Sequence, residues 1–535
     1  MIRLDFWNNP IVVSAFRSKG KKQFPLATYI VLLVGIGAVL EYFSRVSDRP
    51  WITPWTQIHL VVVASVTAGA SFLFAMVATQ SSIAAEVSNK TLDFQRIAGM
   101  SPAQVVVGKI FGEPALAYLL IPASFPVALF GVLKSESLTV GSLLVAYLGL
   151  AAFAVLGGAT GLLHPLEQSS NKPGGGGAAA GWAILFMIGA PYLIGGGFLI
   201  RTSPTAAFVL GTFTPAPVIA GLYAGDVWKY SLHLFDWSIP FAIYSPIVHI
   251  GLSFLLFAVM TRRLKNPVET PLPKPLAYLA LAIADLAIVG YLIGEDPLKK
   301  FGGVGYNLAT YSIASIVVTL LLMFCVTPNR EGVDSWIWRL RGVKHDWRDW
   351  LFGDRSPNLV AVLVMGVVNA AGACVLLAAS GGVREGLIES NLLGTNQAPF
   401  PNWVGVAVAI VLVLSFGFAL QATSLAVKRM TAFIILGTFY LLFGMILAGF
   451  GRSMQWPFAA SLSPFAHFIA WMDPREFQEI GISSTPYFVA FSIVAAVGVG
   501  LTLRYLWGFQ GIVAAKLRGM GITSQEFLGH SAKAN

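Results

Sequence analysis

The amino-acid sequence predicts an all-α polytopic membrane protein with about twelve transmembrane helices in two six-helix halves. The 535 residues are 56% hydrophobic and only 11% charged, with a mean hydropathy of +0.72. A soluble domain carries roughly 25% charged residues. Apolar runs long enough to cross a bilayer, about 20 residues each, recur along the whole chain. The basic residues gather at the ends of these runs, as the positive-inside rule leads us to expect.

The apolar runs are separated by short polar segments, so their limits can be placed to within a few residues. A thirteenth run, 205–224, is interrupted by Pro204, Pro215 and Pro217 and is therefore interpreted as a re-entrant or interfacial element. No small-residue cleavage site follows the first run, which favours a retained span over a signal peptide. The predicted spans are 26–44, 58–79, 113–133, 141–163, 180–200, 240–261, 275–294, 306–326, 358–379, 403–422, 430–450 and 485–508.

The distribution of charge predicts the orientation. An even number of spans places both termini on one side of the membrane. Most of the 35 lysines and arginines then share that side, including Lys21, Arg262 and Arg341, which makes it the cytoplasmic side of a cell (inner) membrane. The segment 80–112 is cytoplasmic in this arrangement. Because the net charge of +10 is scattered over the ends of spans, it argues against a nucleic-acid partner.

The sequence lacks the residue patterns of several kinds of functional site. The two cysteines, Cys325 and Cys374, lie in apolar runs and give neither a disulfide framework nor a metal cluster. The seven histidines are scattered, and no catalytic triad is evident. Neither the glycine run 174–177 nor Gly108-Lys109 has the spacing of a phosphate-binding loop. We therefore expect no enzyme activity, no catalytic or metal-binding residues, and no cofactor held by this chain.

The chain divides into two predicted halves. Residues 1–262 form the first half, the proline-rich segment 263–275 is a linker, and 276–535 form a second, divergent half that ends in a cytoplasmic tail, 509–535. In the second half, apolar residues at helical spacing predict an amphipathic interfacial helix near 334–352. This helix is either a membrane-surface brace, which we favour, or a degenerate counterpart of the element described next.

A helix stop and a helix start follow each other between the second and third spans. Glu86 and Lys90 have the favoured i,i+4 order on a helix. A glycine then suits a helix C-terminus, and a capping box with proline at the first helical position predicts the next helix. The incoming leg, 80–98, is about 28 Å long at the helical rise, whereas the outgoing leg soon becomes apolar. The incoming leg is therefore expected to bend over and lie flat, its charges forming a docking surface. The predicted caps are Gly99, Ser101, Pro102 and Gln104.

Near the N-terminus, Asn9 and Pro10 predict the start of a helix over 10–19. This helix lies along the inner leaflet, or the segment is a plain positively charged anchor; the sequence leaves both interpretations open.

These motifs resemble the ABC-2 type transporter permease family. The resemblance rests on Glu86, Thr91-Leu92-Asp93, Ser101-Pro102 and Gly108-Lys109, with "NNP" at 8–10 before the first span, and it covers 1–262. It implies the membrane-spanning subunit of an exporter whose elbow, 80–103, is a coupling helix that fits a separate ABC ATPase subunit.

The resemblance also implies that ATP and Mg are bound by a dimeric partner ATPase. The implied contact residues are Glu86, Lys90, Thr91, Leu92, Asp93, Phe94, Gln95 and Arg96.

The chain departs from the family pattern in its second half. The family unit has six spans and works as a dimer, whereas here a second half follows, and its loop 327–357 lacks the coupling motif. Two alternatives stay open: the fused chain is the working unit, or a second permease chain pairs with it. Nothing in the sequence selects the transported substrate.

Polar residues inside the spans indicate a second kind of site. A carboxylate at the centre of a span, such as Asp285, costs about 2.5–3.5 kcal/mol on insertion scales. Asp285 therefore either binds a cation, a proton or a substrate, or forms a structural hydrogen bond to a neighbouring helix. Glu113 starts the third span and is a further candidate, although a snorkelling cap is favoured; His249 and Asn369 are interpreted as helix-to-helix hydrogen-bonding groups. Two other functions follow as alternatives: an ion-coupled secondary transporter that uses Asp285, or a non-transporting membrane scaffold that recruits a cytoplasmic partner.

Overall fold

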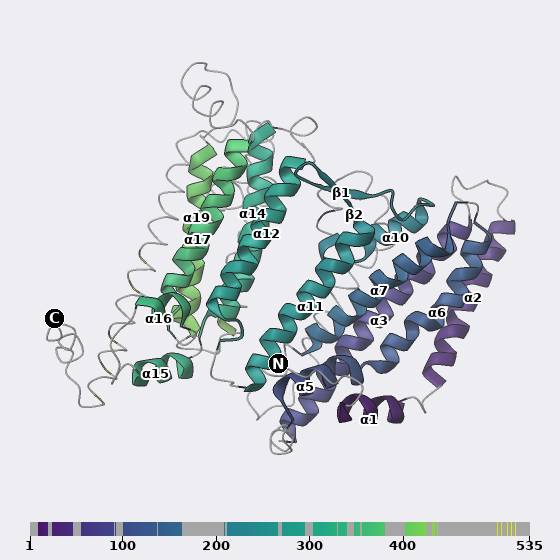
Figure 1. Ribbon diagram of the computed structural model, residues 1–535, viewed down its shortest axis with the longest axis horizontal. Helices are drawn as coiled ribbons and strands as arrows, with labels where there is room; N and C mark the ends of the chain where they lie inside the picture. The colour runs from purple at the N-terminus through teal and green to yellow at the C-terminus, as the bar shows by residue number, and fades with distance from the viewer. Residues whose placement is uncertain are drawn as a thin grey trace, which may run out of the picture. The chain divides into compact units, whose positions relative to one another are not determined.

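The computed structural model consists of two compact units (Figure 1). The first contains Met1–Leu232 and Ser238–Lys265, and the second contains His233–Trp237 and Asn266–Asn535. The boundary at Lys265 lies inside the expected linker, 263–275. The residues that the structure describes are 9–19, 24–46, 55–89, 91, 100–135, 137–162, 208, 211–265, 270–294, 303–328, 330–339, 347–353, 356–379, 402–424, 431–433 and a few isolated positions up to 519.

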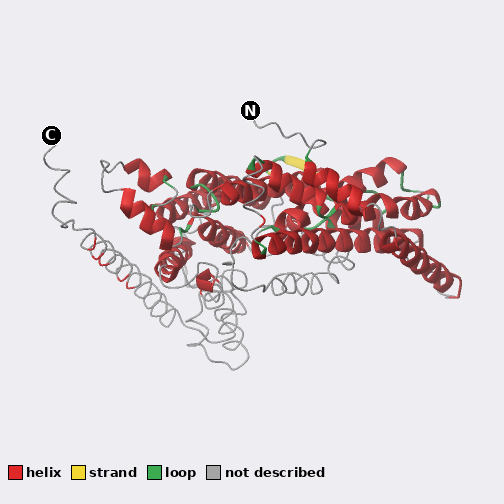
Figure 2. Cartoon of the chain, turned by 90° about the horizontal axis from the view of Figure 1, so that it is seen from below, coloured by secondary structure: helices red, strands yellow, loops and turns green. Residues whose placement is uncertain are grey.

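The described part of the chain is almost entirely helical (Figure 2), and much of it is apolar. Two shorter apolar helical stretches, Ala27–Val39 and Thr310–Val326, fall within predicted spans, and a further helix covers 403–422. The predicted spans 180–200, 430–450 and 485–508 lie outside the described residues, apart from isolated positions, so the number twelve stays a prediction. Six of the described helices are long and apolar enough to cross a membrane: Ile58–Glu86, Ala115–Leu133, Val140–Gly161, Phe241–Lys265, Lys274–Gly294 and Leu359–Ala379.

The first unit is built around one long helix, α3, which packs against α2, α6, α7 and α10. Its core consists of aliphatic and aromatic side chains such as Leu60, Leu143 and Phe153. The described helices of this unit are α1 (Pro10–Lys19), α2 (Phe24–Val46), α3 (Trp55–Ser88), α5 (Pro102–Val107), the π-helix η1 (Gly108–Gly112), α6 (Ala115–Leu133), α7 (Val140–Gly161), α10 (Ala216–Tyr223) and α11 (Phe241–Lys265).

Helices α3 and α7 approach each other closely because two glycines of α7 face the backbone of α3. A Cβ atom on Gly157 would lie 2.5 Å from the carbonyl oxygen of Phe72, and one on Gly161 would meet the carbonyl oxygen of Met76. The two glycines are four residues apart and so share one face of the helix. Small residues at this spacing let helices in a membrane pack backbone to backbone.

The outward face of α11 is apolar, and its inward face carries polar groups. Ile243, Ile247, Ile250 and Phe254 are largely exposed at spacings of three and four residues, whereas His249 is fully buried. A soluble helix shows the opposite arrangement. Together with the spanning lengths, this pattern indicates a multi-pass protein embedded in a membrane.

The proline-interrupted stretch 205–224 does not form one continuous helix. The chain bends at Thr214 and Pro215, and the eight-residue helix α10 then packs its buried face on α3 and α7. A short hairpin follows, formed by β1 (Ser231–Leu234) and β2 (Trp237–Pro240). The all-α prediction missed this hairpin.

The hairpin turn belongs to the second unit and is held by α12. Phe235 has a positive φ of 53°, which is uncommon for a residue with a side chain. Its backbone N–H donates to the carbonyl oxygen of Gly290 at 2.7 Å. A Cβ atom on Gly290 would lie 2.7 Å from the Phe235 ring, so the missing side chain at 290 makes room for the turn.

Four long helices of the second unit, α12, α14, α17 and α19, run side by side (Figure 1). The amphipathic helix predicted near 334–352 is represented by α15 and α16, and the intervening 340–346 lie outside the described residues. The helices of this unit are α12 (Lys274–Gly294), α14 (Gly303–Val326), α15 (Arg330–Arg339), α16 (Trp347–Phe352), α17 (Leu359–Ala379) and α19 (Asn402–Ser424).

Candidate functional site

The incoming leg of the predicted elbow begins as a direct continuation of α3. This helix is unbroken from Trp55 to Ser88, and Gln80 and Ile83 are buried in the unit. The expectation that the chain bends over from about residue 80 is therefore wrong for 80–88. Helix packing accounts for the difference, because the buried face of α3 extends past the polar boundary as far as Ile83.

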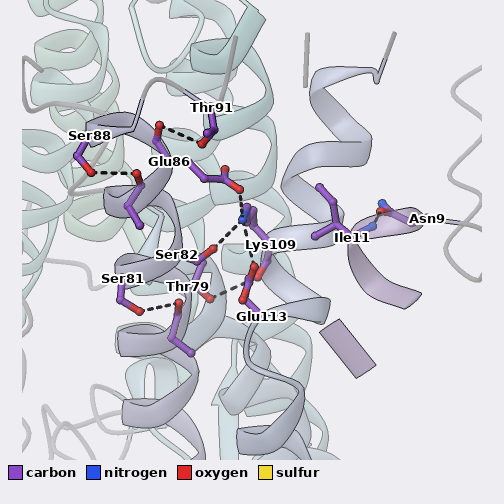
Figure 3. Close-up of polar contacts among 12 residues, drawn as sticks. Asn9, Ile11, Thr79, Ser81, Ser82, Glu86, Ser88, Thr91, Lys109 and Glu113 are labelled. Atoms are coloured by element: carbon purple, nitrogen blue, oxygen red, sulfur yellow. Dashed lines mark hydrogen bonds and ion pairs between the residues drawn. The ribbon is translucent and has the colours of Figure 1, made fainter. Parts of the chain in front are cut away.

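A buried lysine lies where α3 meets the start of the third span (Figure 3). Lys109 is 2% exposed, and its ammonium group donates to Ser82 Oγ at 2.6 Å, to Glu86 Oε1 at 2.6 Å and to Glu113 Oε1 at 3.1 Å. All three ammonium hydrogens are thus used. Two acceptors lie on α3 and the third follows η1. Because charge-assisted hydrogen bonds are the stronger kind, this Lys109 cluster ties the two segments together.

Lys109 belongs to the π-helical turn η1, which lies between α5 and α6. Pro114 follows η1 and has no N–H to donate to the carbonyl oxygen of Ile110 four residues earlier. That oxygen accepts instead from the Tyr118 hydroxyl at 2.6 Å. Gly158 of α7 leaves space for the same hydroxyl, since a Cβ atom there would lie 2.6 Å from it. π-Helical turns inside α-helices are found frequently at functional sites.

We expect Tyr118→Phe to destabilise the protein by about 1–3 kcal/mol, because the carbonyl oxygen of Ile110 would be left buried without its donor. The measurement is the free energy of unfolding of the full chain in mixed detergent micelles. Pro114→Ala provides the control, since it restores the backbone N–H that proline lacks. The double variant should lose less stability than Tyr118→Phe alone; strictly additive effects would contradict the assignment.

The start of α5 has the predicted capping box. Ser101 Oγ accepts from the backbone N–H of Gln104 at 3.2 Å, and Gln104 Oε1 accepts from the N–H of Ser101 at 2.9 Å. Pro102 occupies the first turn. The local chemistry of these three residues thus agrees with the sequence-based expectation.

Helix α1 is anchored to this same turn. Asn9 caps α1 by accepting from the N–H of Ile11 at 3.0 Å, and its amide donates to the carbonyl oxygen of Gln104 at 2.7 Å. A Cβ atom on Gly108 would lie 2.7 Å from Ile11 Cβ, so the glycine admits α1. In Figure 1, α1 lies across the end of the helices that it contacts, η1 and α6. The predicted cap and helix over 10–19 are confirmed.

Only part of the predicted coupling set falls within the described residues. Glu86 belongs to the last turn of α3, and Thr91 Oγ1 donates to the carbonyl oxygen of Glu86 at 3.4 Å. The other predicted coupling and cap residues of this segment lie outside the described residues: Lys90, Leu92, Asp93, Phe94, Gln95, Arg96 and Gly99.

Sequence reasoning missed the central residue of the site. Lys109 entered only as half of the Gly-Lys pattern, although a lysine four residues before Glu113 is a signal for an ion pair. Glu113 was interpreted as a snorkelling cap. In the structure its carboxylate pairs with Lys109, and its side chain is 21% exposed.

The sequence predicts helix-to-helix hydrogen bonds for two further polar residues, Asn369 and His249. Asn369 does bond across helices, to Ser315 and Thr319 on α14. His249 does not: among the described residues, neither ring nitrogen has a hydrogen-bond partner. Its ring packs on Phe153 instead, with centroids 5.3 Å apart. Asp285 lies buried midway along α12 and accepts from Ser315 Oγ at 2.6 Å.

The site carries acid and base groups but no recognisable metal centre within the described ranges, where no three His, Cys, Asp or Glu side chains are placed to hold an ion. No protein-family model, curated protein or solved structure matches the chain. The apolar helices of spanning length define the class: a helical, multi-pass protein embedded in a membrane.

Proposed function

We propose that the protein is the transmembrane permease subunit of an ABC-type exporter, driven by ATP hydrolysis on a separate ATPase subunit. The observation that carries the proposal is the Lys109 cluster, which joins the end of α3 to the start of the third span. Two of the residues that carry the resemblance to the ABC-2 type permease family, Glu86 and Lys109, belong to this cluster, and the other motifs of 86–109 lie between them in the sequence. In the proposed orientation the cluster is at the cytoplasmic end of the first unit.

The contacts support a mechanical route from the coupling segment into the membrane. A partner that pushes on 90–98 would act directly on the end of α3 at Ser88. The cluster would pass this displacement to η1 through Lys109. Helix α6 would move with η1, because the Tyr118–Ile110 bond joins them. Packed elements of this kind transmit force as discrete shifts.

In the second unit, we assign a bracing role to the amphipathic segment. Lys274 is fully buried at the start of α12 and donates to Ser356 Oγ at 2.7 Å and to the carbonyl oxygen of Pro357 at 3.0 Å. Tyr278 also donates to the carbonyl oxygen of Leu351 in α16, at 3.0 Å. The Tyr278 bond ties α16 to a span, and the Lys274 bonds hold the segment that follows α16 to the same span. This arrangement suits a brace better than a lever that a partner moves.

The test is a charge exchange in the coupling segment of the full chain. Asp93→Arg combined with Arg96→Asp keeps the net charge but inverts the docking pattern. We expect Mg-dependent ATP hydrolysis that co-purifies with the tagged chain from its native membranes to fall at least about tenfold, or about 1.4 kcal/mol of binding. The matched control is Asp226→Asn, which alters an exposed carboxylate in the loop before the hairpin.

The alternatives predict different outcomes. Transport that persists without nucleotide and follows a proton or sodium gradient would establish the ion-coupled secondary transporter. A co-purifying partner with no ATP hydrolysis and no flux would favour the scaffold. Equal loss of hydrolysis in the charge-exchanged chain and in Asp226→Asn would remove the coupling segment from the mechanism.

A further inference from the structure

A second polar site lies in the middle of the second unit and plays no part in the coupling route. Asp285 is 3% exposed on α12, between α14 and α17. Its Oδ1 lies 2.6 Å from Ser315 Oγ. Its Oδ2 is buried and has no hydrogen-bond partner among the described residues. Such a group calls for an explanation, because buried polar atoms are nearly always paired.

The network beyond Ser315 extends to α17. Ser315 Oγ also lies 2.8 Å from Asn369 Oδ1, and Asn369 Nδ2 donates to Thr319 Oγ1 at 3.0 Å. Thr319 in turn donates to the carbonyl oxygen of Ser315 at 2.7 Å. The hydroxyl of Tyr311 donates to the carbonyl oxygen of Asn369 at 3.0 Å. Three helices therefore meet in one connected set of hydrogen bonds.

With the Asn369 amide oriented so that its Oδ1 faces Ser315, counting hydrogens shows that the arrangement is one proton short if Asp285 is ionised. A serine hydroxyl has a single hydrogen, yet Ser315 Oγ has two close acceptors, Asp285 Oδ1 and Asn369 Oδ1. If Asp285 is a carboxylic acid, its Oδ1–H donates to Ser315 Oγ and the serine hydrogen goes to Asn369. Each of the two close contacts of Ser315 Oγ then has one hydrogen.

In the described part of the second unit, the helices that pack around Asp285 place no basic side chain beside its carboxylate. The sequences of α14, α17 and α19 contain no Asp, Glu, Lys, Arg or His. Lys274 is three helical turns away along α12, where it is bound to Ser356. A buried charge without a partner is costly, and burial favours the neutral acid. The other titratable or charged groups on the elements packed around Asp285 are Tyr278, Tyr291, Tyr306, Tyr311, Cys325, Cys374, Arg348 and Asp349, with His233 and Asp236 in the hairpin turn.

A small cavity lies on the far side of the network. Its volume is about 20 Å³, which is room for one water molecule. The polar part of its lining comes from Tyr311, Ser312, Ser315 and Asn369, and aliphatic side chains of α14, α17 and α19 complete it. A water there would reach both Ser315 and Asn369, so the network connects Asp285 to a place where a proton can be accepted.

We propose that Asp285 is a proton-binding site that exchanges through Ser315 and Asn369 with water in this cavity. On release, the Asp285 O–H bond breaks and the proton passes to the cavity water. The Asn369 amide then turns over, so that its Nδ2 donates to Ser315 Oγ and the serine donates to the new carboxylate. The orientation of the Asn369 amide on α17 thus depends on whether Asp285 on α12 carries a proton. This proposal is independent of the exporter assignment, because it concerns a different unit and needs no ATPase.

The test is infrared difference spectroscopy of the full-length protein in lipid vesicles during a pH change, with no sodium present. We expect a carboxylic-acid C=O band that disappears on raising the pH and is absent from Asp285→Asn. Asp226→Asn, which removes an exposed carboxylate, should leave the band unchanged. Ser315→Ala should retain the band at a shifted frequency, because the 2.6 Å hydrogen bond is gone, so a poorly folding Asp285→Asn does not prevent the test.

Two results would overturn the proposal. The first is a wild-type spectrum with no carboxylic-acid band that depends on Asp285 or shifts in Ser315→Ala. The second is removal of the band at fixed pH by sodium chloride but not by choline chloride, which would make the site a sodium site.

Discussion

Lys109→Met is expected to destabilise the first unit by about 3–5 kcal/mol, the usual cost of removing one partner from a buried ion pair. Methionine keeps most of the length of the side chain but leaves Glu86 and Glu113 without the ammonium group that bridges them. Ser82 loses its donor as well. The measurement is the free energy of unfolding of the purified chain in mixed micelles, compared with the wild type.

The informative control neutralises all three ionisable groups. Lys109→Met combined with Glu86→Gln and Glu113→Gln removes the uncompensated negative charge, and buried ion clusters replaced by neutral groups are often tolerated. The triple variant should therefore be more stable than Lys109→Met alone. If the triple variant is as unstable as the sum of its single changes, the three groups are not coupled and the cluster does not join α3 to η1.

The same variants separate stability from coupling. In the proposed route, the triple variant folds but joins α3 and η1 less firmly, so ATP hydrolysis continues without driving transport. Asp226→Asn should change neither stability nor coupling, because its carboxylate caps only a local turn, accepting from the N–H of Trp228 at 2.9 Å.

Local chemistry made several features of this fold predictable from sequence. The caps at Asn9 and Ser101 depend on residues within three positions of each other, and both are present. The span limits also follow local composition: α7 and α12 begin within a residue of their predicted starts. The prolines at 215 and 217 mark the place where the thirteenth apolar run is broken.

Features that depend on packing between distant segments were not predictable in the same way. Lys109 pairs with a glutamate 23 positions earlier, and nothing in the local pattern sets the rotation of α3 that brings Glu86 to face it. The burial of Gln80 and Ile83 likewise depends on neighbours that cover α3. In the second unit, Asp285 and Asn369 stood out as polar residues in apolar runs, but Ser315, which connects them, is an ordinary residue in a membrane helix.

The hairpin illustrates a further limit. Its strands are four residues each, too short for a clear alternating pattern. The residue in the left-handed region is a phenylalanine, Phe235, rather than the glycine or asparagine that marks such turns. The conformation of Phe235 depends on its hydrogen bond to the carbonyl oxygen of Gly290 on α12. The sequence around Phe235 therefore does not predict the turn.

Gly161→Val is the second change from which we expect a large loss, at least about 1–3 kcal/mol, the usual cost of overpacking. The first added carbon would already meet the carbonyl oxygen of Met76. That oxygen belongs to the backbone of α3 and cannot rotate away, so α3 and α7 must separate. Gly157→Ala should act in the same direction, because its Cβ would lie 2.5 Å from the carbonyl oxygen of Phe72.

The matched control is Gly251→Ala on α11, where no atom lies within 4 Å of the added Cβ. Alanine is the better helix former by about 1 kcal/mol, so this variant should be neutral or slightly more stable. Because α3 carries Glu86, a shift of α3 away from α7 should also lengthen its contact with Lys109. Gly161→Val should therefore reduce ATP-driven coupling as well as the free energy of unfolding. Equal stability of the Gly161 and Gly251 variants would show that α3 and α7 do not pack backbone to backbone in the membrane.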